Sequence, residues 1–424
     1  MLEQLLSELR DDLDQLDARS LRRRLTPRPA VGRIVHLDGK PLINLAANDY
    51  LALSQHPHLK QAAIDAINRY GTGATASRLV TGHLTPHQSL EQRFSAFKHP
   101  TAPPGFSISN QQSAISNYNS LLFPTGYTAN LAVLSTLAGQ GDLIAIDKLT
   151  HASLIDAARA TPADVRTYPH LHHEKLTRLL ARHQQTPTPK SEIRNPKSEI
   201  PNSHPRPPRR FIVTDSVFSM DGDTADLPAL CDLADRYDAI LIVDEAHGTG
   251  VLGQTGTGLA EAQHVAHRIP IIISTASKAL GSLGGIVTAP APIIDTLINR
   301  ARAFIYTTGV PPAQADTIAA ALDVIRDEPE RRHRLADLSA RLRTALQGQG
   351  WPLPTTDYPT PIIPLQVGTA ERALALASHL QQAGYLAVAI RPPTVAPNTA
   401  RVRLSLRADL TDTDIENLIT ALAR

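Results

Sequence analysis

The stretch IVDEAHGTGVLGQTGTG, residues 242–258, places an Asp, a Glu and a His directly after an apolar run. The run AILIVD at 239–244 has the length and β-branched character of a strand that is buried on both faces. Asp244 therefore ends a predicted buried strand, and His247 follows three residues later. The letters DEAH also occur in nucleic-acid helicases, which need a phosphate loop of the form GxxxxGK[ST]. The only Gly-Lys pair, at 39–40, is followed by proline, so the helicase interpretation is excluded.

Other apolar runs with the same character flank this strand on the chain. They are DLIAID at 142–147, FIVTD at 211–215 and IPIIIST at 269–275. Helical patterns such as LPALCDLADRY at 227–237 lie between them, and this alternation predicts an α/β fold with a doubly wound, mostly parallel sheet. Ligands of such sheets bind beyond the carboxyl ends of the strands, where Asp215, Asp244 and the segment STASK (274–278) stand.

The C-terminal part of the chain has a different pattern. Two helices, at about 312–326 and 331–347, precede a β-α-β-β-α pattern that is typical of a small α+β domain. We therefore expect an N-terminal helix and small segment at 1–45, a large α/β domain at 46–300 and a C-terminal α+β domain at 301–424.

The first residues predict an amphipathic helix. Its leucines recur three or four residues apart, at Leu2, Leu5, Leu6, Leu9, Leu13 and Leu16. We expect the helix to end in Arg22, Arg23 and Arg24, where cations suit the helix dipole.

Composition excludes several classes of protein. The net charge of +2 gives no global reason to expect a nucleic-acid or membrane partner. No apolar run has the length of a bilayer span, and the acidic start of the chain is unlike a secretion signal. The single cysteine, Cys231, excludes an intrachain disulfide framework and fits the reducing cytoplasm.

Two stretches look like insertions into the large domain, near 103–120 and 186–208. PKSEIRN is followed by PKSEIPN at 189–202, and SISNQQS is followed by the looser repeat AISNYNS at 107–120. Neither has helical or strand periodicity, so we expect loosely held surface loops. The basic PRPPRR at 205–210 fits the solvated end of such a loop.

A lysine completes a possible catalytic group. Lys278 follows the predicted strand at 269–275, where desolvation would lower its pKa and expose a nucleophilic amine. Such a lysine forms Schiff bases with aldehydes, and pyridoxal 5'-phosphate needs this lysine, an acid for its pyridine nitrogen and a phosphate cradle. Asp244 is the candidate acid, and His247 could reach the phenolic oxygen of the ring.

Each of these residues has a plainer interpretation. A strand-ending Asp is often a cap or turn former, and His151 in DKLTHASLIDA fits an ordinary helix start capped by Thr150. A non-catalytic binding protein built on the same cofactor fold is one alternative. A metal site on HLHHE (170–174) is another, although no partner ligands are evident and we expect no metal.

Six ordered blocks resemble the α-oxoamine synthases, which are fold-type I pyridoxal-phosphate enzymes. The blocks are NDYLALS, FPTGYTAN, LTHASLIDA, VTDSVFSMDGD, VDEAHGTGVLG and STASKALGSLGG. The resemblance covers nearly the whole chain, and it implies this fold and cofactor together with an obligate homodimer that shares its active sites.

The resemblance also implies roles for single residues. Lys278 matches the lysine that binds the cofactor covalently and acts as the base at Cα, Asp244 the acid on the pyridine nitrogen, and His151 the histidine stacked on the ring. The other matching cofactor contacts are Ser219 and His247 near the phenolic oxygen, Gly126 and Tyr127 at a helix start, Thr275 at the phosphate, and Thr307 and Thr308 at the phosphate of the other subunit.

The tail AVAIRPPTVAPNTARVRLSL (387–406) resembles the biotin-pathway branch of this family. That branch condenses L-alanine with a pimeloyl thioester, carried on coenzyme A or on acyl carrier protein. Arg403 matches the residue that holds the alanine carboxylate, while Arg22, Asn48 and Thr394 match the acyl side, and His151 also meets the substrate. A branch that takes glycine, such as the 2-amino-3-ketobutyrate or 5-aminolevulinate type, is the alternative. The order TVAPN replaces the usual Pro-x-Gly, so we expect an altered turn.

Overall fold

The computed structural model describes every residue except 28, 30, 100–116, 186–205 and 424. It divides into two compact units. Unit 1 comprises Met1–His56, Ser219–Asp223 and Glu328–Arg424, and unit 2 comprises Pro57–Phe218 and Thr224–Asp327. No helix among the described residues is long and apolar enough to cross a bilayer.

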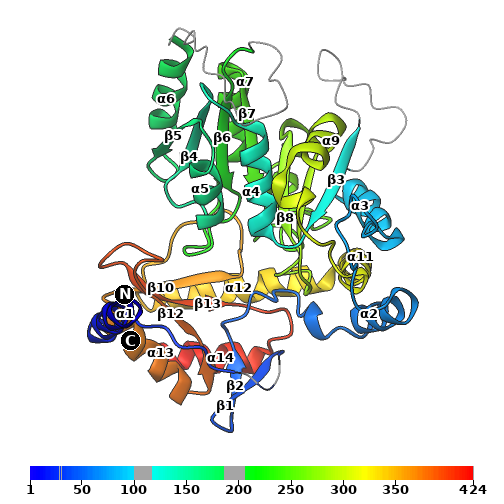
Figure 1. The fold of residues 1–424 in the computed structure, drawn as a ribbon. Helices are drawn as coiled ribbons and strands as arrows, with labels where there is room; N and C mark the ends of the chain where they lie inside the picture. Colours follow the sequence, from blue (N-terminus) through cyan, green and yellow to red (C-terminus); the bar gives the residue numbers. More distant parts are fainter. Residues whose placement is uncertain (28, 30, 100–116, 186–205, 424) are drawn as a thin grey trace. The chain divides into compact units, whose positions relative to one another are not determined.

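Unit 2 is built on a seven-stranded sheet with the order β3-β9-β8-β7-β6-β4-β5 (Figure 1). The strands are β3 (Tyr118–Phe123), β4 (Leu143–Asp147), β5 (Asp164–Tyr168), β6 (Arg210–Asp215), β7 (Ala239–Asp244), β8 (Ile271–Thr275) and β9 (Gly285–Pro290). The neighbours from β8 to β5 pair in parallel, and β9 pairs antiparallel with both β3 and β8. The predicted α/β class is confirmed, and four of the strands lie where the apolar runs predicted them.

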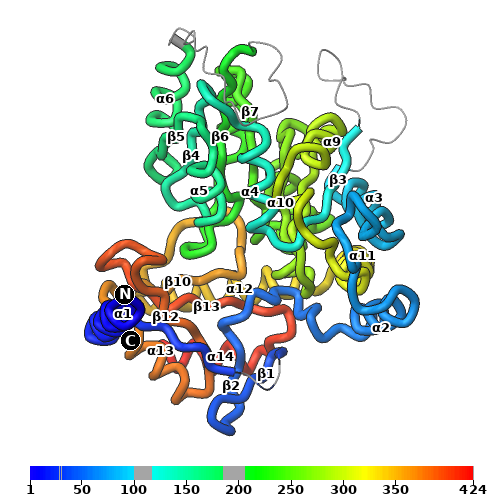
Figure 2. The backbone as a smooth tube through the Cα atoms, in the orientation of Figure 1, coloured from blue at the N-terminus to red at the C-terminus, as the bar shows by residue number. Residues whose placement is uncertain are grey.

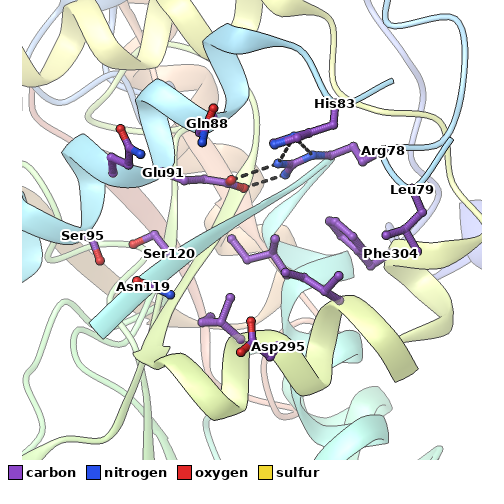
Figure 3. Close-up of a pocket in the computed structure, with 14 residues that line it drawn as sticks. Arg78, Leu79, His83, Gln88, Glu91, Ser95, Asn119, Ser120, Asp295 and Phe304 are labelled. Carbon is purple, nitrogen blue, oxygen red and sulfur yellow. Dashed lines mark hydrogen bonds and ion pairs between the residues drawn. The ribbon is translucent and has the colours of Figure 1, made fainter. Parts of the chain in front are cut away.

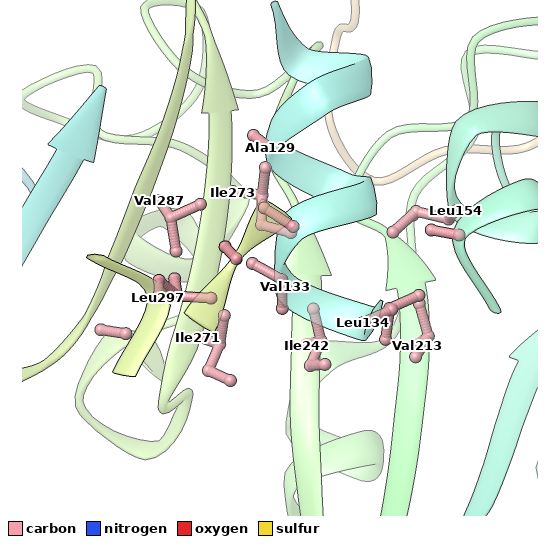
Figure 4. Close-up of a cluster of buried hydrophobic side chains, with 14 of the residues drawn as sticks. Ala129, Val133, Leu134, Leu154, Val213, Ile242, Ile271, Ile273, Val287 and Leu297 are labelled. Carbon is pink, nitrogen blue, oxygen red and sulfur yellow. The ribbon is translucent and has the colours of Figure 1, made fainter. Parts of the chain in front are cut away.

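Helices cover this sheet because its central strands are apolar on both faces. The helices of unit 2 are α2 (Pro57–Tyr70), α3 (Thr85–Lys98), α4 (Gly126–Leu137), α5 (Ala152–Arg159), α6 (His173–Gln185), α7 (Leu227–Tyr237), α8 (Leu259–Ala262), η2 (Ala266–Arg268), α9 (Ala291–Arg300), α10 (Arg302–Ile305) and α11 (Pro312–Asp327). On α4, Val133 and Leu134 are fully buried in one cluster with inward side chains of the strands, including Ile242 and Ile271 (Figure 4). This packing holds α4 over the sheet and fixes where its N-terminus lies.

The units do not follow the predicted limits 1–45, 46–300 and 301–424. Helix α11 packs against α2 and α3 and therefore belongs to unit 2. At the other end, β2 (Lys40–Asn44) pairs in parallel with β11 (Tyr385–Leu386), which joins the first 56 residues to the C-terminal part. Pairing between segments that are distant in sequence decides both limits.

Unit 1 contains two three-stranded sheets, β1-β2-β11 and β10-β13-β12. Its remaining elements are α1 (Leu2–Ala18), β1 (Ile34–Leu37), η1 (Leu53–Gln55), α12 (Glu330–Gly348), β10 (Ile362–Gly368), α13 (Ala370–Gln382), β12 (Val388–Ile390), β13 (Ala400–Ser405) and α14 (Asp412–Ala421). Figure 2 shows the blue N-terminal chain and the orange and red C-terminal chain intermixed within this unit. The predicted β-α-β-β-α order is present except at its second strand, where two short strands, β11 and β12, form ahead of β13. Thr369 and Thr411 are the N-caps of α13 and α14.

Helix α1 forms as predicted but ends earlier. It stops at Ala18 because Ser20 takes a left-handed conformation with φ +57°, so Arg22, Arg23 and Arg24 lie beyond the helix. All six predicted leucines of its apolar stripe are exposed, and no residue of the helix is buried.

The two expected insertions are only partly within the described residues. The repeats at 107–116 and 189–202 lie outside them. The end of the looser repeat, from Tyr118, is part of strand β3, so the expectation of a loop up to residue 120 is wrong there. At the end of the second insertion, Arg206, Pro207 and Arg209 are exposed, as expected of a solvated end. The Arg206 guanidinium also makes a two-pronged ion pair with the buried Asp142.

A turn forms at TVAPN in the tail. Asn398 has a φ of +62°, and the Thr399 amide and hydroxyl both donate to the Ala396 carbonyl. Asparagine tolerates this left-handed conformation better than most residues, which explains how the turn forms without glycine there.

Candidate active site

Three predicted site residues of unit 2, Asp244, His247 and Lys278, lie at the carboxyl ends of β7 and β8. Asp244 ends β7, and Lys278 lies in the turn that follows β8. The Lys278 Nζ is 3.0 Å from the His247 Nε2, which is hydrogen-bond distance. Local sequence places these groups at strand ends, and parallel pairing of β7 with β8 sets the ends side by side.

Asp244 is buried and held from two sides. Its Oδ2 accepts from the Asn130 side-chain amide at 2.9 Å, and its Oδ1 accepts from the Ala246 backbone NH at 2.8 Å. These two hydrogen bonds fix the orientation of the carboxylate, as suits a partner for the ring nitrogen of the cofactor.

His151 is the N-cap of α5. Its Nδ1 lies 2.7 Å from the Ser153 Oγ and accepts from the Ser153 NH at 3.3 Å. The ring is exposed, yet the surrounding protein partly desolvates it, which lowers its pKa, while the charge of Asp244 acts in the opposite sense. The interpretation of Thr150 as the cap is wrong, because His151 takes that place.

The N-terminus of α4 offers the phosphate cradle that the cofactor needs. Thr125 caps the helix, and the NH groups of Gly126 and Tyr127 lie in its first turn, where no intrahelical acceptor exists. An anion is favoured there by these donors and by the helix dipole. Thr275 is close by, since a Cβ added to Gly126 would lie 3.4 Å from its Oγ1. Lysine, acid and cradle are all present, so the residues of unit 2 fit pyridoxal phosphate.

The substrate residues predicted on the tail lie in unit 1. Arg403 is buried on β13 and donates to the Ser219 carbonyl at 3.1 Å, to the Ser405 Oγ at 3.0 Å and to the Asn48 Oδ1. All three acceptors are neutral. Within the described part of the chain, no carboxylate pairs with this guanidinium.

Two neighbouring arginines, Arg401 and Arg407, differ from Arg403 because each of them pairs with a carboxylate. Arg401 pairs with Asp221, and Arg407 pairs with Asp49 at 3.0 Å and with Asp409 at 2.9 Å. A buried cation normally has an anionic partner, so Arg403 is the one of the three that is suited to an incoming carboxylate.

The acyl-side residues are only partly brought together. Arg22 pairs with Asp17 at 2.7 Å, and it is Arg23 that donates to the Thr394 Oγ1, at 3.1 Å. Asn48 contacts Arg403 and therefore lies at the other group of substrate residues. Sequence reasoning missed Arg23, although it belongs to the same arginine run.

Thr307 and Thr308 follow α10 in unit 2. Thr308 forms an isolated antiparallel bridge with Ser77, and the Ser77 hydroxyl donates to the Ile305 carbonyl at 2.9 Å. These contacts hold the segment at 305–309 beside the segment at 76–82.

We call the residues around Asp244, Lys278, His247 and His151, at the carboxyl ends of β6, β7 and β8, the strand-end group. Three side chains in this group were not among the predicted site residues. Asn130 and Ser153 connect His151 to Asp244, and Asp215 accepts from the His151 NH at 3.1 Å. Asn130 closes the block FPTGYTAN, and Asp215 ends a predicted strand, so both carried a signal. Their hydrogen bonds depend on contacts across elements, which the sequence does not show.

A cavity of about 310 Å³ lies elsewhere in unit 2 (Figure 3). Its wall carries the ion pair of Arg78 with Glu91, and His83 and Phe304 stand near the guanidinium. None of the predicted site residues lines it, and its mixed lining offers no nucleophile activated by a base. The strand-end group carries the chemistry instead.

The HLHHE segment does not gather metal ligands. His170 bonds to Asp147 at 3.0 Å, and His173 begins α6. The described residues contain no group of three or more His, Cys, Asp or Glu side chains placed to hold a metal ion.

Comparison with known proteins agrees with this geometry. The chain matches the family "Aminotransferase class I and II" over residues 40–422, and it belongs to that family. It is 40% identical to the 8-amino-7-oxononanoate synthases of Anaeromyxobacter dehalogenans, over 97% of this chain and 94% of the relative, and of Geobacter sulfurreducens, over 97% and 96%. The resemblance drawn from the six sequence blocks is thereby confirmed.

Solved structures support the fold. A serine palmitoyltransferase from S. paucimobilis with a bound PLP-myriocin aldimine superposes with a TM-score of 0.84, at 25% identity, over 100% of this chain and 98% of that chain. The 8-amino-7-oxononanoate synthase from Francisella tularensis superposes with a TM-score of 0.70, at 27% identity, over 90% and 97%.

Proposed function

We propose that the chain catalyses the decarboxylative condensation of L-alanine with a pimeloyl thioester, with pyridoxal 5'-phosphate as cofactor. The products are 8-amino-7-oxononanoate, CO₂ and the free thiol. The observation that carries the proposal is the 3.0 Å contact of the Lys278 amine with His247, beside the buried Asp244, in a chain 40% identical to synthases of that name.

The residues of unit 2 would hold the cofactor and move a proton. When bound, pyridoxal phosphate supplies an electron sink that stabilises negative charge at the alanine Cα. Lys278 would bind the aldehyde and then take the Cα proton on its Nζ, while Asp244 would keep the ring nitrogen protonated. His151 would cover one ring face, and His247, with Ser219, would serve the phenolic oxygen. The Gly126 and Tyr127 NH groups and Thr275 would bind the phosphate.

Arg403 would hold the alanine carboxylate. Its three acceptors in the structure are neutral, so a carboxylate would give the buried guanidinium the anionic partner that it lacks. This grip orients the alanine Cα for bond formation to the acyl carbon. The acyl C–S bond then breaks, the thiol leaves, and the former alanine carboxylate departs as CO₂.

The acyl chain would meet Arg22, Asn48 and Thr394. Arg23 joins this proposed group because it already bonds to Thr394. A cation beside a hydroxyl suits the free carboxylate of a pimeloyl chain, which distinguishes it from a plain fatty acyl chain.

We further propose a homodimer in which Thr307 and Thr308 reach the phosphate of the other subunit. The contacts between the segments at 76–82 and 305–309 produce one surface in unit 2. Three large apolar side chains stand on it: Leu79 is 51% exposed, Val80 75% and Tyr306 72%. Apolar side chains grouped on one surface are typical of an interface between subunits.

The proposed setting is the cytoplasm. The lone Cys231 is a buried free thiol, and the described residues contain no membrane-spanning helix. Neither a nucleic-acid nor a membrane partner is part of the proposal.

A synthase for another amino acid is the second candidate, because the cofactor residues suit the whole α-oxoamine synthase family. The deciding experiment incubates purified protein with alanine, glycine or serine and with pimeloyl, acetyl or succinyl thioester. Product is followed by mass spectrometry and CO₂ release. We expect condensation with alanine and the pimeloyl donor only. Running both pimeloyl-CoA and pimeloyl-acyl carrier protein identifies the donor, and condensation of glycine in preference to alanine would contradict the proposal.

A further inference from the structure

A chain of hydrogen bonds connects Asp244, the predicted partner of the ring nitrogen of the cofactor, with His151, which is predicted to stack on the ring face. It begins at Asp244, whose Oδ2 accepts from the Asn130 Nδ2 at 2.9 Å. The same Nδ2 donates to the Ser153 Oγ at 2.8 Å, and the Ser153 Oγ lies 2.7 Å from the His151 Nδ1. Asn130 and Ser153 are each only 1% exposed, so water does not compete for the bond between their side chains.

The direction of each bond follows from the chemistry of the groups. An ionised Asp244 only accepts, so Asn130 must turn its amide nitrogen toward it; the opposite flip would set two oxygens face to face. The amide nitrogen has two protons, and the second goes to the Ser153 Oγ. The Ser153 hydroxyl therefore has its own proton free for the His151 Nδ1.

The His151 ring is thus left with one arrangement. Two donors point at its Nδ1, the Ser153 hydroxyl and the Ser153 backbone NH at 3.3 Å. A proton on Nδ1 would oppose both of them, so the neutral ring carries its proton on Nε2. Partial desolvation, which lowers the pKa of His151, favours the same neutral form.

We propose that Asn130 and Ser153 are positioning residues of the site, which together orient Asp244 and hold His151 as the neutral tautomer with its proton on Nε2. Asp215 completes the arrangement by accepting the His151 backbone NH at 3.1 Å, which fixes the start of α5. The buried side-chain amide of Asn130 therefore orients the Asp244 carboxylate directly and the His151 imidazole through Ser153. The proposal rests on the proposed function for its consequence in turnover, but the direction of the bonds can be measured independently.

The first test uses the unaltered protein. Ring ¹⁵N signals of histidine-labelled protein, with His151 assigned through His151→Gln, report the tautomer directly. At about pH 7.5 an ordinary imidazole is mostly neutral, and we expect the His151 proton on Nε2 both in the cofactor-bound and in the cofactor-free protein. A ring with its proton on Nδ1, or a doubly protonated ring, would overturn the proposal, and this result does not depend on which substrates the protein accepts.

Variants test the two positioning residues. Ser153→Ala removes the hydroxyl, and we expect a mixture of both tautomers; Ser153→Thr keeps the hydroxyl and should restore the native signal. Asn130→Leu removes both donors at similar volume, and the pH titration of the cofactor's visible absorption band should shift. For both Ser153→Ala and Asn130→Leu we expect kcat/KM for alanine to fall about 10- to 100-fold, the usual effect of losing a residue that orients a catalytic one.

The matched control lies on the same helix as Asn130. Ser135 is exposed on α4 and bonds only to the Leu131 carbonyl of its own helix, at 2.6 Å. Ser135→Ala should leave the His151 signals and the titration unchanged. Native His151 signals in folded Ser153→Ala and Asn130→Leu proteins would refute the positioning role. Absence of condensation in the unaltered protein, with the expected tautomer, would instead refute the proposed function alone.

Discussion

Two buried aspartates at opposite ends of the same sheet are held in opposite ways. Asp142 precedes β4 and has four donors: two from the Arg206 guanidinium at 2.7 and 2.6 Å, and the Arg209 and Gly139 NH groups, each at 2.8 Å. Asp215 ends β6 and accepts one NH, from His151 at 3.1 Å, while its Oδ1 has no hydrogen-bond partner among the described residues.

The consequence for charge is opposite at the two positions. Burial alone would raise the pKa of Asp142, but the bonds from Arg206, Arg209 and Gly139 outweigh it and lower that pKa. Burial raises the pKa of Asp215 well above its usual value, and the charge of Asp244 raises it further. A carboxylate that serves the fold is fully paired. At the strand ends of the candidate site, by contrast, Asp215 is a buried carboxyl group with one oxygen that accepts no hydrogen bond. Buried carboxyl groups with unpaired oxygens and shifted pKa values are typical of functional sites.

The largest test of this contrast removes the nucleophile at the strand ends. Lys278→Ala should be colourless after addition of pyridoxal phosphate and should lose at least about a thousandfold in turnover, because covalent binding and proton transfer both need the amine. Thermal unfolding should change little, since the residue is not in the core. A Lys278→Ala protein that keeps the visible band of the lysine-bound cofactor would contradict the assignment.

Asp244 provides a graded version of the same test. Asp244→Asn keeps a similar shape but no negative charge, so it should retain some cofactor yet lose most turnover, because the ring nitrogen is no longer held protonated. Cofactor content by absorbance and turnover by product formation separate the two effects. Full turnover in Asp244→Asn would exclude the residue as the acid.

The arginines of unit 1 extend the contrast between paired and unpaired charges. Arg403→Ala should weaken the alanine-induced change in the cofactor spectrum by about 30-fold or more, because losing a buried partner typically costs about 2–5 kcal/mol. Arg22→Ala should leave that spectrum intact and raise the KM for the acyl donor by a smaller factor, since Arg22 is solvent-accessible and already paired with Asp17. The reverse pattern would mean that the two ends of the substrate are exchanged.

Arg206→Ala tests the structural end of the sheet. Asp142 is fully buried and would lose two donors, so we expect a loss of about 1–3 kcal/mol in unfolding free energy, moderated by solvent that replaces the partly exposed arginine. Urea unfolding at neutral pH measures it. Because the folded-state pKa of Asp142 is lowered, its stabilising contribution is present above the unfolded value of 3.8 and is lost as pH falls through the folded value. Bound cofactor should keep its native spectrum.

Asp215→Asn should have the smallest effect. It should leave stability unchanged or raise it slightly, whereas Arg206→Ala should lower it. The raised folded pKa means that ionisation of Asp215 destabilises the cofactor-free protein as pH rises above the unfolded value of 3.8. Asparagine avoids that ionisation, so the variant should be as stable as the native chain or up to about 1 kcal/mol more stable at pH 7. Unfolding curves of the cofactor-free proteins at several pH values measure the difference, which should shrink toward acidic pH. A clear loss of stability at pH 7 would show that Asp215 is held ionised.

Local sequence patterns were enough to predict the fold class and the candidate cofactor residues. Apolar runs with strand character placed four strands of the large sheet, and a strand-ending Asp244 with Lys278 beyond the next strand predicted a cofactor group. These signals are local, because burial on both faces and turn chemistry are written in a few consecutive residues.

Which of these residues contact one another became clear only from the packing of the folded chain. Sequence periodicity could not show that Asn130 bonds to both Asp244 and Ser153, or that Arg23, rather than Arg22, bonds to Thr394. The limits of the two units likewise depend on pairing between distant segments. Hydrogen bonds and ion pairs form between atoms a few ångströms apart, and the positions of those atoms follow from how the elements pack together rather than from the order of residues along the chain.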